Sequence, residues 1–291
     1  MPPPPEISEH VIDLERLFAQ KNPGLFRILP RFIFSYLKKI THQEEINSYI
    51  YKHREKFGLD FVSAILAEFG VNIEAVKASS QPGPVPVADP IIPPTGRFII
   101  ASNHPLGGLD GLALLHAVGK VRPDVVFPVN DLLMFLPGLE PVFIPINKHG
   151  KNTENVEIIQ QTFASEKTIL YFPAGLVSRK GKKGTIKDLV WKKTFITQAR
   201  RYNRDIIPVY ITGRNTSFFY NLANFRKKLG IKANIEMLFL PDQMFRQKNK
   251  TVRLTFGDPI PVSTFDRSHT DQEWAAIVRD RVYSLAKKGQ P

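Results

Sequence analysis

A chain of 291 residues with 43% hydrophobic residues can bury a substantial core, as one large α/β domain or as a smaller domain with an appended segment. It has no cysteine, which excludes disulfides and thiolate metal sites, and no apolar run long enough to span a membrane. A formal net charge of +13 predicts acidic partners, such as anionic lipid, an acidic carrier protein, phosphorylated metabolites or nucleic acid.

Helical patterns dominate the first third of the chain. Apolar residues recur at steps of three and four between residues 7 and 19 and again across residues 43–77, which predicts one helix and then two more that separate near Phe57. Residues 25–39 join large apolar and aromatic side chains to cations. Such a segment can lie in a membrane interface or pack as an ordinary helix, and the sequence leaves both interpretations open. Its cations are Arg27, Arg31, Lys38 and Lys39.

A proline-dense stretch over residues 79–95 predicts an extended linker. We therefore divide the chain into an N-terminal helical region with its linker, residues 1–94, and an α/β domain, residues 95–291. In the second part short apolar runs alternate with helical patterns, which predicts a largely parallel central sheet flanked by helices. The predicted strands are 98–101, 125–129, 142–146, 168–172, 206–212, 235–239 and 252–256, and the predicted helices are 108–119, 152–165, 187–203, 218–229 and 271–287.

The turn after the first of these strands carries the residues of a general base. A histidine becomes a useful base when a carboxylate fixes its tautomer and supports the imidazolium that forms. Asp110 follows His104 by six positions, and six residues of continuous helix would rotate it about 240° away. The pair can meet only if His104 lies in the loop and Asp110 in the first helical turn. Otherwise the stretch is a turn and a helix start without chemistry.

Three later turns also follow predicted strands and carry amide or cationic side chains. They contribute Asn147 and Lys148, then Arg179, then Arg214. Because the carboxyl ends of parallel strands share one edge of a sheet, we expect these side chains to converge with His104 on one crevice. There the cations would bind an anionic head group or a carrier phosphate. Bonding to neighbouring carbonyls is an equal alternative for Arg214, and the lysines after Arg179 fit a solvated charge run better than a site.

The order of these blocks resembles the glycerophospholipid (lysophosphatidic acid) acyltransferase superfamily. The matching blocks, within residues 97–260, are Asn103–Asp110, Phe143–Lys148, Phe172–Gly175 and Ile207–Val209. The resemblance implies that His104 is the general base and Asp110 its partner, that the second block helps to bind the acceptor head group, and that the third block forms a wall of the acceptor site. The candidate substrate-binding residues are Asn103, Gly107, Gly108, Asn147, Lys148, Phe172, Pro173, Gly175, Arg179 and Arg214.

Three features depart from the usual pattern of that superfamily. Five residues, Pro105 to Leu109, separate the histidine from the aspartate, which is one more than usual. Ala174 stands where the third block usually has glutamate, and the arginine of that block is displaced to Arg179. The combination HPLGGLDG, FPAGLVSRK and ITGRN is more similar to the branch of bacterial haemolysin-like proteins and acyltransferases that make amino-acid-containing lipids. The departures bear on the acceptor more than on the reaction.

The resemblance implies an O-acyltransferase that takes its acyl chain from an acyl-carrier-protein or coenzyme A thioester as co-substrate. No His and carboxylate pair has metal-ligand spacing, and the sequence has no phosphate-cradling or dinucleotide-binding loop, so we expect no metal and no bound cofactor. The expected acceptor is the hydroxyl of a lysophospholipid or a related lyso-lipid. The alternative acceptor is the hydroxyl of an N-(3-hydroxyacyl) amino-acid lipid. A further alternative is a non-catalytic lipid-binding module with the same fold, which Ala174 and the wide spacing of His104 and Asp110 support.

The N-terminus and the charge predict where the protein acts. Its first ten residues lack the charged start and apolar core of a secretory signal, and the basic surface suits anionic lipid. We therefore expect a cytoplasmic bacterial protein that is peripheral on the cytosolic face of the inner membrane. A nucleic-acid-binding protein would share the charge, but no groove-reading or base-stacking motif accompanies it, so we expect no nucleic-acid partner.

Overall fold

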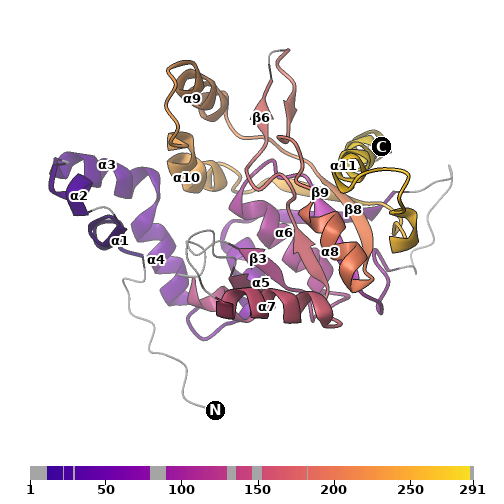
Figure 1. Ribbon diagram of the computed structural model, residues 1–291. Coiled ribbons are helices and arrows are strands. Elements are labelled where there is room, and N and C mark those ends of the chain that lie inside the picture. Colours follow the sequence, from indigo (N-terminus) through magenta and orange to yellow (C-terminus); the bar gives the residue numbers. More distant parts are fainter. Residues whose placement is uncertain are drawn as a thin grey trace.

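The computed structural model describes residues 12–21, 23–28, 30–78, 90–129, 136–145, 153–181 and 183–288. Their centre is a five-stranded sheet with the strand order β1-β9-β8-β2-β5 (Figure 1). Every neighbouring pair runs parallel except β8 and β9, which are antiparallel. The predicted α/β fold with a largely parallel sheet is therefore confirmed. The strands are β1 (Asn72–Lys77), β2 (Phe98–Ser102), β5 (Ile169–Tyr171), β8 (Asp205–Ile211) and β9 (Thr251–Phe256).

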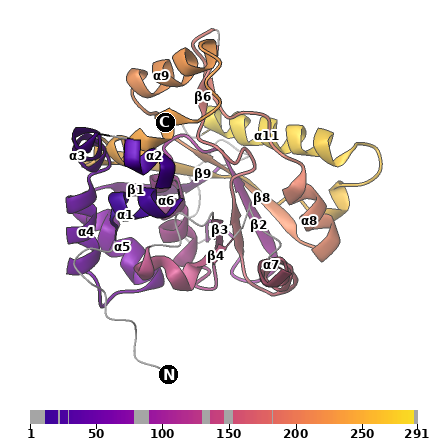
Figure 2. The same ribbon diagram turned by 60° about the vertical axis from the view of Figure 1, so that its left-hand side comes forward.

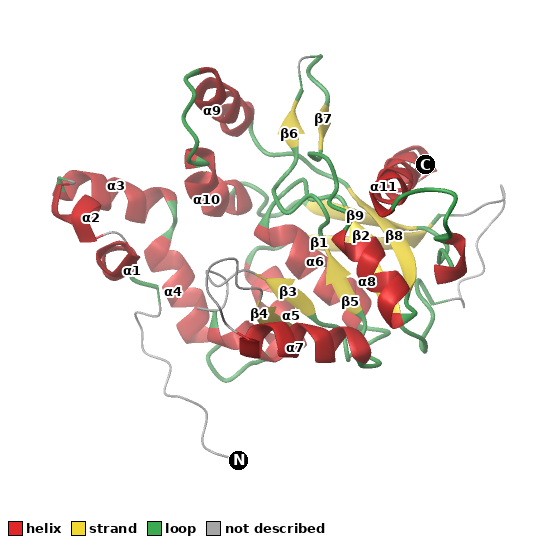
Figure 3. Cartoon of the chain, viewed as in Figure 1, coloured by secondary structure: helices red, strands yellow, loops and turns green. Residues whose placement is uncertain are grey.

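Helices cover both faces of this sheet (Figure 3). Alternate side chains of a strand point to opposite faces, so Ile100 packs with α5 and α6, whereas Ile99 and Ala101 pack with α8 and α11. All five residues of β2 are buried, as an apolar run at the centre of a parallel sheet requires. The covering helices are α5 (Gly58–Glu68), α6 (Gly108–Gly119), α8 (Thr194–Tyr202) and α11 (Asp271–Lys288), and α7 (Thr153–Ala164) packs against α8.

The N-terminal helices form a group beside the sheet, in indigo and violet in Figure 1. They are α1 (Leu14–Lys21), α2 (Pro23–Ile28), α3 (Arg31–Ile40) and α4 (Gln43–Lys52). The predicted helix over residues 7–19 lies partly outside the described residues. In α3, Phe34 and Leu37 are buried, whereas Phe32 and Tyr36 are exposed. Within the described ranges, no helix combines the length and the apolar character needed to cross a bilayer.

Two predicted elements are wrong. Residues 72–77, expected to end a helix, form β1 at the edge of the sheet, because each of them pairs in register with β9. Residues 235–239, expected as a strand, form the 3₁₀-helix η3 (Ile235–Phe239), followed by α10 (Leu240–Phe245). In η3 the carboxylate of Glu236 is buried between two arginines, and this ion pairing holds the segment away from any sheet.

The helix predicted over 187–203 begins only at Thr194, because the residues before it belong to a hairpin and its exit. The two strands of this hairpin, β6 (Arg179–Lys180) and β7 (Ile186–Lys187), are antiparallel and project beyond the sheet with α9 (Ser217–Lys228), as Figure 1 shows. The remaining short elements are β3 (Phe127–Val129), β4 (Phe143–Pro145), η2 (Pro137–Val142) and η4 (Val262–Thr264).

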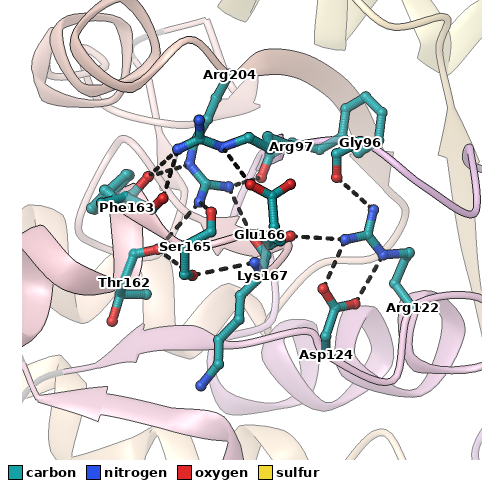
Figure 4. A network of polar contacts seen from close by, with 12 residues as sticks. Gly96, Arg97, Arg122, Asp124, Thr162, Phe163, Ser165, Glu166, Lys167 and Arg204 are labelled. Atoms are coloured by element: carbon teal, nitrogen blue, oxygen red, sulfur yellow. Dashed lines mark hydrogen bonds and ion pairs between the residues drawn. The ribbon is translucent and has the colours of Figure 1, made fainter.

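A buried arginine lies at the end of the sheet where β2 and β8 begin, and Figure 4 shows its polar contacts. Arg204 is fully buried and donates hydrogen bonds to the carbonyls of Phe163 and Lys167, both at 2.7 Å, and to those of Thr162 and Ser165. The last carbonyls of a helix have no partner within it, so Arg204 serves as the C-terminal cap of α7. Burial lowers the pKa of Arg204 to about 10, which leaves it charged at neutral pH.

Candidate active site

The candidate base lies where β2 ends and α6 begins. His104 is in the loop between them, and Asp110 is the third residue of α6. The Nδ1 atom of His104 is 2.9 Å from Oδ2 of Asp110, so the condition set by the sequence is met and the two side chains form a hydrogen-bonded pair. The ring nitrogen that remains for a substrate is Nε2. A histidine that donates from Nδ1 to a carboxylate presents Nε2 as the basic atom.

Asp110 does two tasks with one oxygen. Besides the His104 ring, Oδ2 accepts the backbone N–H groups of Leu106 at 2.8 Å and Gly107 at 3.0 Å, and so caps the start of α6. Gly107 adopts a φ of 87°, and this left-handed backbone turns the chain so that the extra residue between histidine and aspartate is accommodated. The His104 loop is therefore fixed by the same carboxylate that orients the ring.

Burial dominates the electrostatics of this carboxylate. Asp110 is fully buried, and burial raises the pKa of its carboxyl, while the hydrogen bonds from His104, Leu106 and Gly107 act in the opposite direction. A charge held in such a site interacts strongly with any opposite charge beside it, because little water screens the pair. An ionised Asp110 would therefore interact strongly with a positive charge on the adjacent ring.

An aromatic wall fixes the plane of the base. The ring of Phe172 stacks on that of His104, with centroids 4.2 Å apart and an interplanar angle of 18°, and Phe127 meets Phe172 edge-on at 5.3 Å. Phe172 opens the turn Phe172–Gly175, in which the N–H of Gly175 donates to the Phe172 carbonyl at 3.0 Å. Pro173 is buried in this turn and Gly175 is exposed. The block predicted as an acceptor wall thus lies against the base.

A second buried carboxylate, which sequence reasoning missed, holds the backbone of the same loop. Oδ1 of Asp188 accepts the N–H of His104 at 3.2 Å and the hydroxyl of Ser178 at 2.5 Å, and Oδ2 accepts the indole N–H of Trp191 at 2.9 Å. The N–H of Ser178 donates in turn to the His104 carbonyl at 2.8 Å. Asp188 therefore joins the His104 loop to the base of the β6–β7 hairpin.

Of the predicted binding residues, Asn103 makes structural hydrogen bonds, whereas Gly108 and Arg214 are exposed. Asn103 is buried and pairs with the backbone of Ile211 through both side-chain atoms, at 2.9 and 2.7 Å, which extends the pairing of β2 with β8. Gly108, the first residue of α6, is exposed at the N-terminus of that helix. Arg214 is exposed just past β8. Asn147 and Lys148 lie outside the described residues.

Arg179 is bonded to groups other than His104 and Asp110. Its guanidinium donates to Oε1 of Glu236 at 2.7 Å and to the carbonyl of Val177 at 2.9 Å, and the same carboxylate binds Arg226 at 2.5 Å. The side chain of Glu236 is fully buried. This network ties the hairpin to η3 and α9, so the structure places Arg179 in a structural ion pair instead of bringing it to His104.

The described lysines that follow Arg179 lie on the β6–β7 hairpin. Lys180 belongs to β6 and Lys183 is an exposed residue of the hairpin turn, in keeping with a solvated run. In the part of the chain that the structure describes, no three His, Cys, Asp or Glu side chains are grouped as metal ligands would be. The assembled chemistry is that of a general base with an aromatic wall.

Comparison with known proteins places this geometry in a group of enzymes. The family model described as acyltransferase matches residues 16–289. Two curated relatives, from Bacteroides thetaiotaomicron and Phocaeicola vulgatus, are both named lyso-glycine lipid O-acyltransferase. Each is 44% identical over 277 residues, which cover 94% of this chain and 97% and 95% of the relatives. A solved structure of the 1-acyl-sn-glycerophosphate (LPA) acyltransferase PlsC from Thermotoga maritima is 15% identical, with a TM-score of 0.45 over 89% of this chain and 95% of that one.

Proposed function

This chain belongs to the acyltransferase family, and we propose that it transfers a fatty acyl group from a thioester to the hydroxyl of a lyso-glycine lipid. The observation that carries the proposal is the His104–Asp110 pair at the end of β2, beside a hydrophobic wall. Support for the acceptor comes from the two relatives, which are 44% identical to this chain across nearly their whole lengths. The amino-acid lipid is thus favoured over the lysophospholipid that the sequence motifs first suggested.

The reaction needs one base and no covalent enzyme intermediate. Nε2 of His104 takes the proton of the acceptor hydroxyl as its oxygen attacks the thioester carbonyl, and the resulting imidazolium is stabilised by Asp110. The tetrahedral intermediate collapses with cleavage of the carbon–sulfur bond. The imidazolium returns its proton to the leaving thiolate, so the products are an ester and a free thiol. Nothing beyond the two substrates is consumed in this reaction.

The developing oxyanion requires N–H donors that are not already used. The N–H of Gly107 is bonded to Asp110 and that of Gly175 to the Phe172 carbonyl. Gly108 instead offers an exposed backbone at the N-terminus of α6, where the helix dipole favours negative charge. We assign the oxyanion to this first turn of α6.

The basic charge of the protein suits both the acyl donor and an anionic membrane surface. The net charge of +13 suits the phosphates of coenzyme A and an acidic acyl carrier protein alike. In α3, the exposed Phe32 and Tyr36 lie beside the exposed Arg31 and Lys39, a combination suited to an anionic membrane interface on the cytosolic face. Lys38 is already paired with Glu15 at 2.7 Å and contributes less.

A mass-spectrometric transfer assay tests the function. Purified wild-type protein and the His104→Ala variant each receive an acyl-carrier-protein or coenzyme A thioester, with N-(3-hydroxyacyl) glycine and lysophosphatidic acid as parallel acceptors. We expect an acylated glycine lipid from the wild type and a rate lower by about 100-fold or more in the variant. A product only from lysophosphatidic acid would refute the acceptor. Binding of the glycine lipid without any product would identify a non-catalytic module.

A further inference from the structure

Helix α9 carries two apolar faces: one is buried, and the other is largely exposed, with Phe218 meeting Phe239 edge-on at 5.0 Å. Phe219, Tyr220 and Ala223 are buried, and the first two pack with Val177. The other face presents Phe218, Phe225 and Leu229, which are 53%, 58% and 58% exposed, with the half-buried Leu222 between them. Their positions follow the steps of four, three and four residues that align side chains along one stripe of a helix. A surface helix normally carries polar residues on its outer face, so this stripe needs an explanation.

Cations border the stripe and no acid interrupts it. The segment from residue 217 to 235 contains no aspartate or glutamate, and its cations are Arg226, Lys227, Lys228 and Lys232. Arg226 is occupied by Glu236, whereas the three lysines are exposed. Ile231 and Leu238, 40% and 39% exposed, extend the apolar surface past the end of the helix. Apolar side chains surrounded by unopposed lysines match a lipid interface, where the cations meet anionic head groups and the rings enter the acyl region.

We propose that this α9 stripe, Phe218, Phe225 and Leu229 with Lys227, Lys228 and Lys232, docks the enzyme on an anionic bilayer. The proposal rests on the proposed function only in that both substrates carry long acyl chains. It adds a second contact to the one suggested for α3, because η3 packs against both α3 and α9 and joins the two surfaces. Figures 1 and 2 show α9 projecting from the body of the molecule beside the β6–β7 hairpin.

The position of the stripe connects it to the reacting atoms. The inner face of α9 packs on Val177, and the next residue, Ser178, is bonded to the backbone of His104. The amide of Asn224 in α9 donates to the Lys180 carbonyl at 3.3 Å, which fixes the hairpin beside the helix. Docking through α9 would therefore hold the His104 loop close to the bilayer surface, where an acceptor hydroxyl near the head groups can reach Nε2.

Co-sedimentation with vesicles tests the docking directly. The full-length protein is mixed with phosphatidylcholine vesicles that contain or lack phosphatidylglycerol, at low and high salt. Replacing Lys227, Lys228 and Lys232 by glutamine should weaken binding to the anionic vesicles on the order of 100-fold, at about fivefold per lysine. Replacing Phe218, Phe225 and Leu229 by serine should weaken it by about tenfold or more on both vesicle types. Raising the salt should weaken wild-type binding to the anionic vesicles alone.

Two control variants remove the same charge, or the same number of exposed apolar side chains, elsewhere. Lys56, Lys120 and Lys167 are exposed, and their change to glutamine lowers the net charge by the same amount away from α9. Val156, Ile158 and Ile277 are exposed apolar residues on α7 and α11, and their change to serine replaces three exposed apolar residues, as the other variant does. Both controls should bind vesicles within about twofold of the wild type, since the remote charges are screened by salt. Thermal unfolding verifies that every variant is folded.

Activity separates this proposal from the proposed function. On acceptor presented in anionic vesicles, the two α9 variants should lose transfer in parallel with binding, while on acceptor dispersed in detergent they should match the wild type. Vesicle binding of the α9 variants equal to that of the controls would overturn the docking surface, whatever the activity. Loss of binding to acyl carrier protein with vesicle binding unchanged would assign the stripe to the donor and overturn the proposal as well. An inactive wild type that still docks through α9 would refute only the proposed reaction.

Discussion

Replacing Asp110 by asparagine removes the charge of the His104 partner and keeps its shape. Oδ2 of Asp110 accepts three N–H groups, from His104, Leu106 and Gly107, and an asparagine oxygen in the same place can accept them too. The imidazolium then loses the adjacent negative charge, and the asparagine NH₂ occupies the buried position of Oδ1, which has no partner among the described residues. We expect kcat to fall by about 10²- to 10⁴-fold. We expect the free energy of unfolding to fall by about 1 to 3 kcal/mol, because the buried NH₂ has no acceptor among those residues.

The assay follows the release of free thiol from the donor at saturating acceptor, beside urea unfolding of the same preparations. The control is Asp280→Asn on α11, which removes an equal charge from a carboxylate that is 81% exposed and should leave both quantities unchanged. A folded Asp110→Asn enzyme with a kcat within about threefold of the wild type would refute the reasoning. In that case the hydrogen bond alone, without the charge, would suffice to orient His104.

Three further substitutions test structural roles that the sequence does not reveal. Arg204→Met removes the guanidinium that donates to four carbonyls near the end of α7 and should cost about 3 kcal/mol or more in urea unfolding, with the kcat of the folded enzyme unchanged. Arg179→Gln should destabilise the protein by about 2 to 4 kcal/mol through the buried Glu236 and leave KM for the acceptor within about twofold, which steady-state kinetics would test. Asp188→Asn should lower kcat by about tenfold, with a smaller change in KM, because His104 loses a backbone anchor. The Asp188→Glu variant keeps the charge and changes the geometry, so its kcat would show which of the two matters.

The local sequence pattern was enough to predict most helices and strands of the α/β body. The apolar run of β2 and the amphipathic helix after it are found where the sequence places them, and α6 has the predicted bounds of Gly108 and Gly119. The contact between His104 and Asp110 could also be predicted from the sequence, because only one arrangement allowed it: His104 in a loop and Asp110 in the first helical turn. Membership of the acyltransferase family, inferred from the order of the motifs, is confirmed by the match over residues 16–289.

What the sequence could not reveal depends on partners far away along the chain. Asp188 binds the His104 backbone across 84 positions, and Glu236 binds Arg179 across 57. Neither carboxylate lies in a motif, and nothing near either position indicates that it is buried. The run Ile235–Phe239 has the composition of a strand, but the ion pairs of Glu236 decide its conformation. Tertiary contacts override propensity most readily in short elements such as β1 and η3.

The wide spacing of His104 and Asp110 shows which geometry a candidate base requires in physical terms. A base needs its Nδ1 within hydrogen-bond reach of a carboxylate, and the number of intervening residues matters only through the turn that they make. Here Gly107 supplies that turn with a φ of 87°, and Asp110 stabilises it by accepting the N–H of Gly107 itself. The extra residue is thus compatible with the 2.9 Å contact, so the longer spacing by itself is no argument for a fold that has lost its catalytic activity.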